Sequence, residues 1–468
     1  MMRLGLAKLP LVQGGDGGLA EEAIAGRTPG SAWIAGTVRM VKKGKTSVRS
    51  GGAGQVGTGP KGMRERSSCS PAKVAVIMIC FILCSHWAVA KCSGRGESGI
   101  ADSPDSLLAE AAMEQISAMD VAEIERFIRG LDDDIAENMP EFNIIELMSN
   151  QAAGIFDLGG LARKAVSFLL REVKVNLKLL GELIVVAMIG SILCTFGSGL
   201  GEEGPCAMAW AVCYMTLVTM GIRSFSVSAD LATGAVDSMI SFMHAIIPAL
   251  VGLLATSGGV TTAAVVSPLV LVATTTVGTL VKTTVIPLLL LGAALTLVGN
   301  VSDRKQVTKL ASLLRWWSMT ILGLASTLFV AFVGVRGGLA SVSDAASAKA
   351  AKFLAGSMIP VIGKVFGDAI DLVAASSLVV RGALGAFGLV SLVVVCLFPV
   401  FKMVAVMLMF KIAAAVAEPL GDPRVSDCLG ELADVLSALC ICVTTVGLMF
   451  FICISLVVGL SGLVVAIR

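Results

Sequence analysis

Residues 239–270 read MISFMHAIIPALVGLLATSGGVTTAAVVSPLV, two apolar segments joined by a glycine pair. Pro248 and Pro268 flank Gly258 and Gly259 on either side, and a proline removes a backbone donor and bends a helix. In hydrocarbon, irregular backbone persists only where protein or a water-filled cavity covers it. The stretch therefore predicts either a re-entrant hairpin that lines a pathway or a tight turn between two ordinary spans. His244, which opens the hairpin, is either a proton-sensitive group or a hydrogen-bonded structural side chain.

The composition of the whole chain also points to lipid. The 468 residues are 56% hydrophobic and 15% charged, with a mean hydropathy of +0.87, whereas a soluble domain is about 45–50% apolar and about 25% charged. Two histidines and one tyrosine make a His-based metal site or a Ser-His-Asp triad improbable. No phosphate-binding loop, dinucleotide fingerprint or metal-ligand spacing occurs. We expect a membrane protein that is not an enzyme, holds no cofactor or metal and binds no nucleic acid.

The amino-terminal residues have the features of a secretory signal that starts late. Residues 1–62 are rich in glycine and lack periodicity, so they predict a non-native or disordered leader. After Met63 come basic residues, an apolar run at 74–87 and the small-residue triplet 88–90, which together predict a signal peptide over 63–90. A signal anchor that stays uncleaved is the alternative. Met63 is the start site that this pattern favours.

Residues 91–178 predict a small, acidic, helical extracytoplasmic region. Asp120 and Glu123 have the spacing of a helix-capping box, and apolar residues then recur every three or four positions. The region ends in a segment with basic residues on one helical face and apolar residues opposite, which fits a helix in the headgroup plane or an amphipathic helix packed on neighbouring protein. The basic residues are Lys164, Arg171, Lys174 and Lys178.

The remainder, 179–468, predicts a multi-span membrane domain of eight or nine helices. Pro399 and Lys402 alone separate two of its apolar blocks, which therefore also fit one kinked helix. The more polar segment 336–380 predicts one or two amphipathic helices at the interface. The apolar blocks are 179–196, 206–222, 239–256, 260–281, 284–299, 316–335, 383–400, 402–417 and 436–460. Most of the twelve cysteines lie inside these blocks, where a free cysteine serves as a small apolar side chain.

The basic loop at 300–315 gives an orientation. If the signal exports residue 91 onward, this loop faces the cytoplasm, as the excess of positive charge in cytoplasmic loops requires. The basic cluster at 163–178 then lies outside, which runs against the same rule. The loop is either a topology signal or a contact surface for a cytoplasmic ATPase. Its basic residues are Arg304, Lys305, Lys309 and Arg315, against the single acid Asp303.

Two further groups of charges lie near apolar segments. Lys411 and Glu418 are seven residues apart and therefore share a helix face, where they either pair or extend to the interface. Lys364, Asp368 and Asp371 also share a face, for which a salt-bridged surface is the simpler interpretation.

Four segments in a fixed order carry a resemblance to a known family. They are GNVSDRKQVTKLASLLR (299–315), AKFLAGSMIPVIGKVFGDAIDLVAASSLVV (351–380), FPVFK (398–402) and KIAAAVAEPLGD (411–422). With the hairpin at 239–270, they make residues 105–468 similar to the stage III sporulation protein AE family. The resemblance implies a mother-cell membrane protein of endospore formation, facing the forespore. It also implies an assembly with the other stage III sporulation AA-to-AH proteins and stage II sporulation protein Q, which supports late forespore gene expression.

Together these features predict an all-α, polytopic transmembrane helical bundle with a small helical extracytoplasmic amino-terminal region. The favoured function is a non-enzymatic component of a channel or secretion-like complex between mother cell and forespore, in contact with membrane lipids. The alternative is an autonomous permease for a small metabolite or ion that uses the hairpin of Pro248, Gly258, Gly259 and Pro268 with His244. An intramembrane enzyme is a third, weaker alternative. The family resemblance transfers no catalytic residue.

Overall fold

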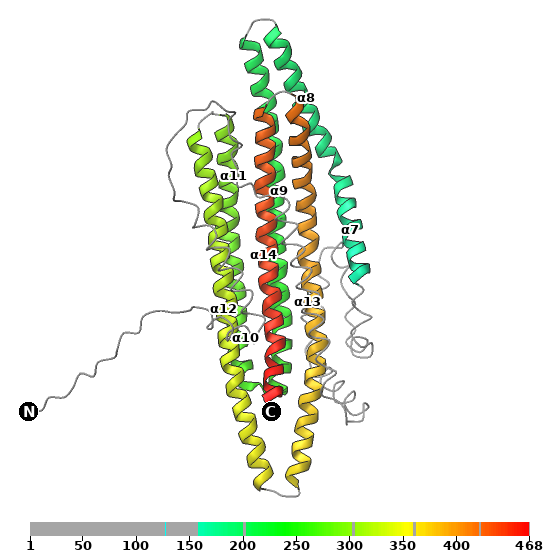
Figure 1. Cartoon of the computed structure of the whole chain (residues 1–468), viewed down its shortest axis with the longest axis vertical. Coiled ribbons are helices and arrows are strands. Elements are labelled where there is room, and N and C mark those ends of the chain that lie inside the picture. The colour runs from blue at the N-terminus through cyan, green and yellow to red at the C-terminus, as the bar shows by residue number, and fades with distance from the viewer. Residues whose placement is uncertain are drawn as a thin grey trace, which may run out of the picture. The chain divides into compact units, whose positions relative to one another are not determined.

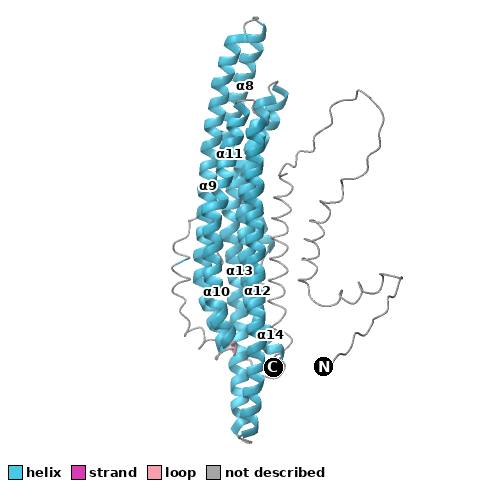
Figure 2. Cartoon of the chain, turned by 90° about the vertical axis from the view of Figure 1, so that its left-hand side faces the viewer, coloured by secondary structure: helices cyan, strands magenta, loops and turns pink. Residues whose placement is uncertain are grey.

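The computed structural model is almost entirely helical in the part of the chain that it describes, which is residue 127 and residues 158–199, 203–301, 305–358, 362–420 and 423–467. All belong to the second of two compact units, Ser67–Arg468. No strand occurs in these ranges, and Figure 2 shows the helices running side by side. The helices are α7 (Leu158–Val175), α8 (Leu177–Gly199), α9 (Glu203–Thr256), α10 (Val260–Leu280), the π-helix η1 (Val281–Val285), α11 (Ile286–Val301), α12 (Lys305–Met358), α13 (Ile362–Ala417), the 3₁₀-helix η2 (Glu418–Leu420) and α14 (Pro423–Ile467). The all-α transmembrane bundle predicted from the sequence is confirmed.

Five helices in the described residues are long and apolar enough to cross a membrane, and a sixth results if the bent pair α7–α8 is one span. The expected count of eight or nine is therefore wrong. Blocks 206–222 and 239–256 both lie on α9, because the charged residues between them lower the hydropathy without ending the helix. The five apolar segments are Ala211–Thr256, Val260–Gly299, Lys309–Asp344, Ala375–Ala417 and Val425–Gly459.

The prolines likewise fail to end helices. Pro248 lies inside α9, Pro268 inside α10 and Pro399 inside α13. Helix α13 contains both 383–400 and 402–417, so the single-helix alternative is confirmed there. Neighbouring helices and local adjustments satisfy the backbone groups that a proline frees within a membrane bundle. The polar segment 336–380 forms the end of α12 and the start of α13.

After the blocks merge, the predicted side of loop 300–315 depends on whether the bent pair α7–α8 crosses the membrane as one span. Five expected spans precede this loop, whereas the structure has Ala211–Thr256 and Val260–Gly299 in their place, with α7–α8 as a third if that bent pair is one span. A chain that starts outside reaches the cytoplasm at residue 300 only after an odd number of spans, so the predicted side of the loop requires α7–α8 to cross the membrane. The orientation itself stays a prediction.

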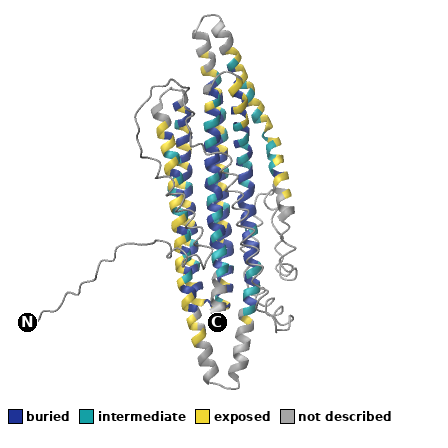
Figure 3. Ribbon diagram, viewed as in Figure 1, coloured by how far each residue is buried: buried dark blue, intermediate teal, exposed yellow. Residues whose placement is uncertain are grey.

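The core lies around α13 and α14, which pack extensively against each other. Within its most apolar window, α13 is 78% buried and α12 only 22%, and Figure 3 shows exposed residues along α12. Cys396, Cys440 and Cys442 are free and buried, which confirms that these cysteines serve as packing side chains. A Cβ added to Gly447 would lie 2.6 Å from Cys396 Sγ, so the absence of a side chain there lets α13 and α14 approach closely.

The amino-terminal predictions fall mostly outside the described residues. This is true of the leader 1–62, the signal peptide 63–90 and nearly all of the acidic region before 158. Helix α7, where the basic amphipathic face was expected, packs on α13 (Figure 1): the ring of Phe168 lies 4.5 Å from that of Phe398, centroid to centroid. This contact fits the packed alternative, and a place in the headgroup plane stays a prediction.

Candidate functional site

A row of ionisable residues runs along one face of α9. Arg223, Asp230, Asp237 and His244 follow one another at intervals of seven residues. Seven residues fall about 20° short of two full helical turns, so four such positions stay on one face. All four are exposed on the bundle, although they lie inside the apolar segment Ala211–Thr256. The row spans about 32 Å, close to the thickness of a hydrocarbon core.

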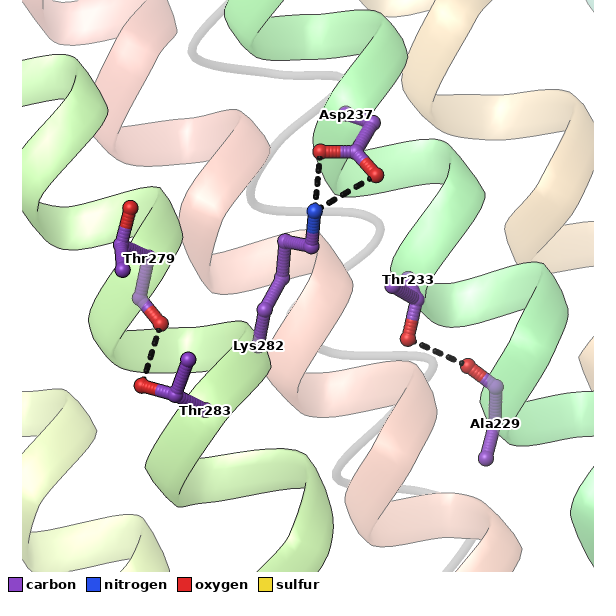
Figure 4. Close-up of polar contacts among 6 residues, drawn as sticks. All are labelled: Ala229, Thr233, Asp237, Thr279, Lys282 and Thr283. Atoms are coloured by element: carbon purple, nitrogen blue, oxygen red, sulfur yellow. Dashed lines mark hydrogen bonds and ion pairs between the residues drawn. The ribbon is translucent and has the colours of Figure 1, made fainter.

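An ion pair joins this row to the next helix. Lys282 Nζ donates to both carboxylate oxygens of Asp237, at 2.7 and 2.8 Å. Figure 4 shows the lysine reaching across from η1 to α9. The side chains of Lys282 and Asp237 are 32% and 51% exposed. The pair lies about 28 Å along α9 from Thr256, so it sits deep inside the apolar segment.

The lysine is carried by a π-helical turn. η1, Val281–Val285, interrupts the rod formed by α10 and α11. A π turn inserts an extra residue into an α-helix and is frequent at functional sites. Next to the lysine, the Thr283 hydroxyl donates to the Thr279 carbonyl at 2.8 Å, which satisfies it within its own helix (Figure 4).

His244 makes the second link between the two helices. Its Nε2 lies 3.0 Å from Thr275 Oγ1, and the Thr275 hydroxyl donates to the Leu271 carbonyl at 2.8 Å. When the Thr275 hydroxyl donates its one proton to Leu271, its oxygen accepts from His244 in the tautomer that carries the proton on Nε2. We call the surface made of Arg223, Asp230, Asp237, His244, Thr275 and Lys282 the polar seam.

Sequence reasoning found only one member of the polar seam. His244 is predicted as the start of a broken hairpin, whereas it lies inside the continuous helix α9. Asp237 and Lys282 are missed because the apolar block 239–256 begins after Asp237 and the block 260–281 ends just before Lys282. The signal that finds the row is the seven-residue repeat of ionisable residues.

The glycine pair forms a tight turn between two long helices, the second of the two alternatives. Gly258 has φ +98, a left-handed conformation. The N–H of Gly259 donates to the Leu254 carbonyl and that of Gly258 to the Ala255 carbonyl, at 3.0 and 3.1 Å. These two bonds form a Schellman motif, the common way to end a helix at a glycine. A role of this turn in a pathway stays a prediction.

Asp344 of α12, which the sequence did not single out, secures the start of α10. Its carboxylate accepts the backbone N–H of Thr261 at 3.0 Å and that of Thr262 at 2.7 Å, and the residue is 3% exposed. The first N–H groups of a helix have no partner inside it and favour a negative charge. The Thr256 hydroxyl lies 3.0 Å from that of Ser377 on α13, so the turn contacts α12 and α13 together.

Most of the predicted basic loop 300–315 is helical: α11 ends at Val301 and α12 begins at Lys305, so three of its four basic residues lie on α12. Arg304 is outside the described residues and the side chain of Lys305 is not described, but Lys309 is exposed and Arg315 half-buried on α12. Trp316 and Trp317 follow, 61% and 49% exposed. Tryptophans gather at membrane–water boundaries, so this end of α12 has the composition of an interface.

The expected partner of Lys411 is corrected. Its Nζ lies 2.7 Å from Asp434 Oδ1 on α14, rather than against Glu418, which begins η2. Helix α14 packs against α13 and supplies the carboxylate that pairs with Lys411. The side chains of Lys364, Asp368 and Asp371 are not described. Among the described residues, no group of three or more His, Cys, Asp or Glu side chains is placed to hold a metal ion.

Comparison with known proteins assigns the family. The pattern of the stage III sporulation protein AE family matches residues 142–461. The chain belongs to the stage III sporulation protein AE family. The stage III sporulation protein AE of Bacillus subtilis (strain 168) is 34% identical to it over 302 residues, 64% of this chain and 76% of that protein. No solved structure matches the chain. The polar seam, the glycine turn and Asp344 all lie within the residues that match the stage III sporulation protein AE family. The family is one of sporulation proteins, and the long apolar helices of this chain are those of a multi-pass membrane protein.

Proposed function

We propose that this chain is a non-enzymatic membrane component of the channel or secretion-like complex that links mother cell and forespore during sporulation. Membership of the stage III sporulation protein AE family supports the role in sporulation, and the long apolar helices support a place in the membrane. In this proposal the chain sits in the mother-cell membrane that faces the forespore and is needed for late forespore gene expression.

The polar seam is the observation that carries the assembly role. A charged side chain at the centre of a membrane helix costs about 2.5–3.5 kcal/mol on insertion scales. Asp237 and Lys282 neutralise each other, but neither Arg223 nor Asp230 has a hydrogen bond or ion pair to another described residue. Within the described part of the chain these two groups are exposed on the bundle, and lipid offers them no hydrogen-bond partner. The seam therefore favours a chain whose outer face is covered within a larger assembly.

The proposed partners are the other stage III sporulation AA-to-AH proteins and stage II sporulation protein Q. Residues 91–178 would face the space between the two membranes and meet the extracytoplasmic partners. The basic residues of the cytoplasmic loop, including Lys309 and Arg315, would meet a cytoplasmic ATPase. The charge of that loop and the tryptophans beside it support its place at a membrane boundary.

An autonomous permease is the second candidate. It is favoured by the polar groups that gather where the α9–α10 turn meets α12 and α13, namely Asp344, Thr256 and Ser377. Purified protein in proteoliposomes separates the two functions. An assembly component shows no uptake of small metabolites or ions by itself, whereas a permease transports alone and loses transport when Gly258 is replaced by a bulky residue.

Gene disruption in the sporulating host tests the proposal directly. We expect the disrupted strain to lose late forespore gene expression and heat-resistant spores, and a gene that starts at Met63 to restore both. Affinity purification of the restored protein during sporulation should recover other stage III sporulation proteins. Normal spores from the disrupted strain would remove the assignment.

A further inference from the structure

We propose that a second copy of this chain covers the polar seam, with the two copies related by a twofold axis parallel to the membrane normal. This inference goes beyond the proposed function, since it concerns contacts between identical chains and requires no sporulation partner. It follows from the placement of Asp237 and Lys282 on neighbouring helices.

The membrane restricts how two copies can meet. Identical chains insert with the same orientation, so the axis that relates them runs along the membrane normal and equivalent residues lie at the same depth. In a twofold interface, residue i of one copy contacts residue j of the other, and j contacts i. A self-complementary surface therefore needs complementary groups side by side at one depth.

The ion pair meets this condition. Asp237 and Lys282 lie on two adjacent helical elements, α9 and η1, and are joined at 2.7 Å. Facing the same surface of a second copy, each carboxylate comes opposite the ammonium group of the other chain. The result is a ring of four charges with alternating sign. Where little water is present, each added opposite neighbour is worth far more than in bulk solvent.

The hydrogen-bonding capacity of the pair leaves room for these contacts. Lys282 uses two of its three donors on Asp237, and each carboxylate oxygen has a further lone pair. Both side chains remain partly exposed at the surface of the bundle. A lipid chain offers neither donors nor acceptors here, whereas a second copy offers both at the matching depth.

The backbone beside the pair permits close approach. Gly234 and Ser241 are exposed on the same side of α9 and are also seven residues apart, and a Cβ added to Gly234 would have no atom within 4 Å. Small residues on a membrane helix let a second helix come near. The seven-residue interval suits two helices of the same direction packed along their length.

A charge swap tests the inference. The double variant Asp237→Lys/Lys282→Asp keeps the pair within each chain but reverses its direction. Two wild-type copies, or two swapped copies, retain the alternating ring. A mixed pair instead brings two carboxylates together and two ammonium groups together, and like charges in an interface oppose association strongly. The swap therefore changes which copies associate without removing any charge.

The measurement is co-purification of two differently tagged full-length chains expressed together in a host without other sporulation proteins. We expect wild type to recover wild type, swapped to recover swapped, and the mixed combination to fall by about tenfold. Equal recovery of the mixed combination would overturn the proposal, as would failure of two wild-type copies to co-purify. Efficient recovery of swapped by swapped shows that the variant folds.

Cross-linking supplies a second, independent measurement. Ser241→Cys should form a disulfide between copies on mild oxidation, and Leu328→Cys, at a position that is 60% exposed on α12, should not. Cross-linking at position 328 instead would place the contact elsewhere and refute the twofold seam. Because this host makes no spores, a failure here is distinct from a failure of the sporulation role.

Discussion

Replacing Asp344 by alanine tests the link between α12 and the start of α10. The carboxylate is 3% exposed and accepts two backbone N–H groups, from Thr261 at 3.0 Å and from Thr262 at 2.7 Å. Substitution of a side chain that caps a helix amino terminus costs about 0.5–2 kcal/mol, and a hydrogen bond to a charged group contributes about 1.5–3 kcal/mol. Removing the carboxylate also relieves the cost of burying its charge. We expect the free energy of local unfolding of the first turn of α10 to fall by about 2 kcal/mol.

Amide hydrogen exchange on the full chain in nanodiscs measures this loss. A change of about 2 kcal/mol lowers protection of the first turn of α10 by about 30-fold. Asp344→Asn keeps one acceptor oxygen, so its protection of this turn should lie between that of Asp344→Ala and that of wild type. Ser343→Ala, at an exposed position next to it on α12, is the control and should leave protection unchanged. Wild-type protection of this turn in Asp344→Ala would refute the reasoning.

Two further substitutions test local features of the bundle. Gly258→Ala places a side chain on a residue with φ +98 and should lower the free energy of unfolding by about 1–2 kcal/mol, whereas Gly252→Ala, inside α9 with nothing within 4 Å of the added Cβ, should not lower it. Denaturation in detergent measures the free energy of unfolding of both variants. Equal stability of the two would contradict the left-handed conformation of Gly258. Lys411→Met leaves Asp434, 16% exposed, without its ammonium partner and should cost about 3 kcal/mol. Adding Asp434→Leu should recover most of that loss in the same assay, and no recovery would contradict the ion pair.

The class of fold could be predicted from the sequence because composition and hydropathy depend on whether a chain is surrounded by water or by lipid. An apolar block long enough to cross a bilayer indicates a membrane helix. The sequence did not predict how blocks join. Three ionisable residues of α9, from Arg223 to Asp237, lower the local hydropathy and suggest a loop, yet the helix continues through them. Helix continuity is decided by backbone hydrogen bonds, which a charged side chain does not break.

The candidate site was predicted only in part for a related reason. The glycine pair was found because Gly258 and Gly259 have a local signature that any turn must carry. Asp344 has no such local signature, because it is a lone acid in an Ala/Ser-rich segment. The backbone groups that it binds are more than 80 residues earlier in the chain. The partner of Lys282 is likewise 45 residues away. Such contacts depend on which helices become neighbours, which a single sequence does not state.

Sporulation of a strain that lacks the chromosomal gene tests most directly whether the polar seam serves the proposed assembly. The strain carries wild type, Asp237→Lys, Lys282→Asp or the double variant, each at equal membrane abundance, and heat-resistant spores are counted. We expect both single variants to lose spores, because each places two like charges inside an apolar segment, and the double variant to sporulate as wild type does. Wild-type spore counts from both single variants would contradict the account.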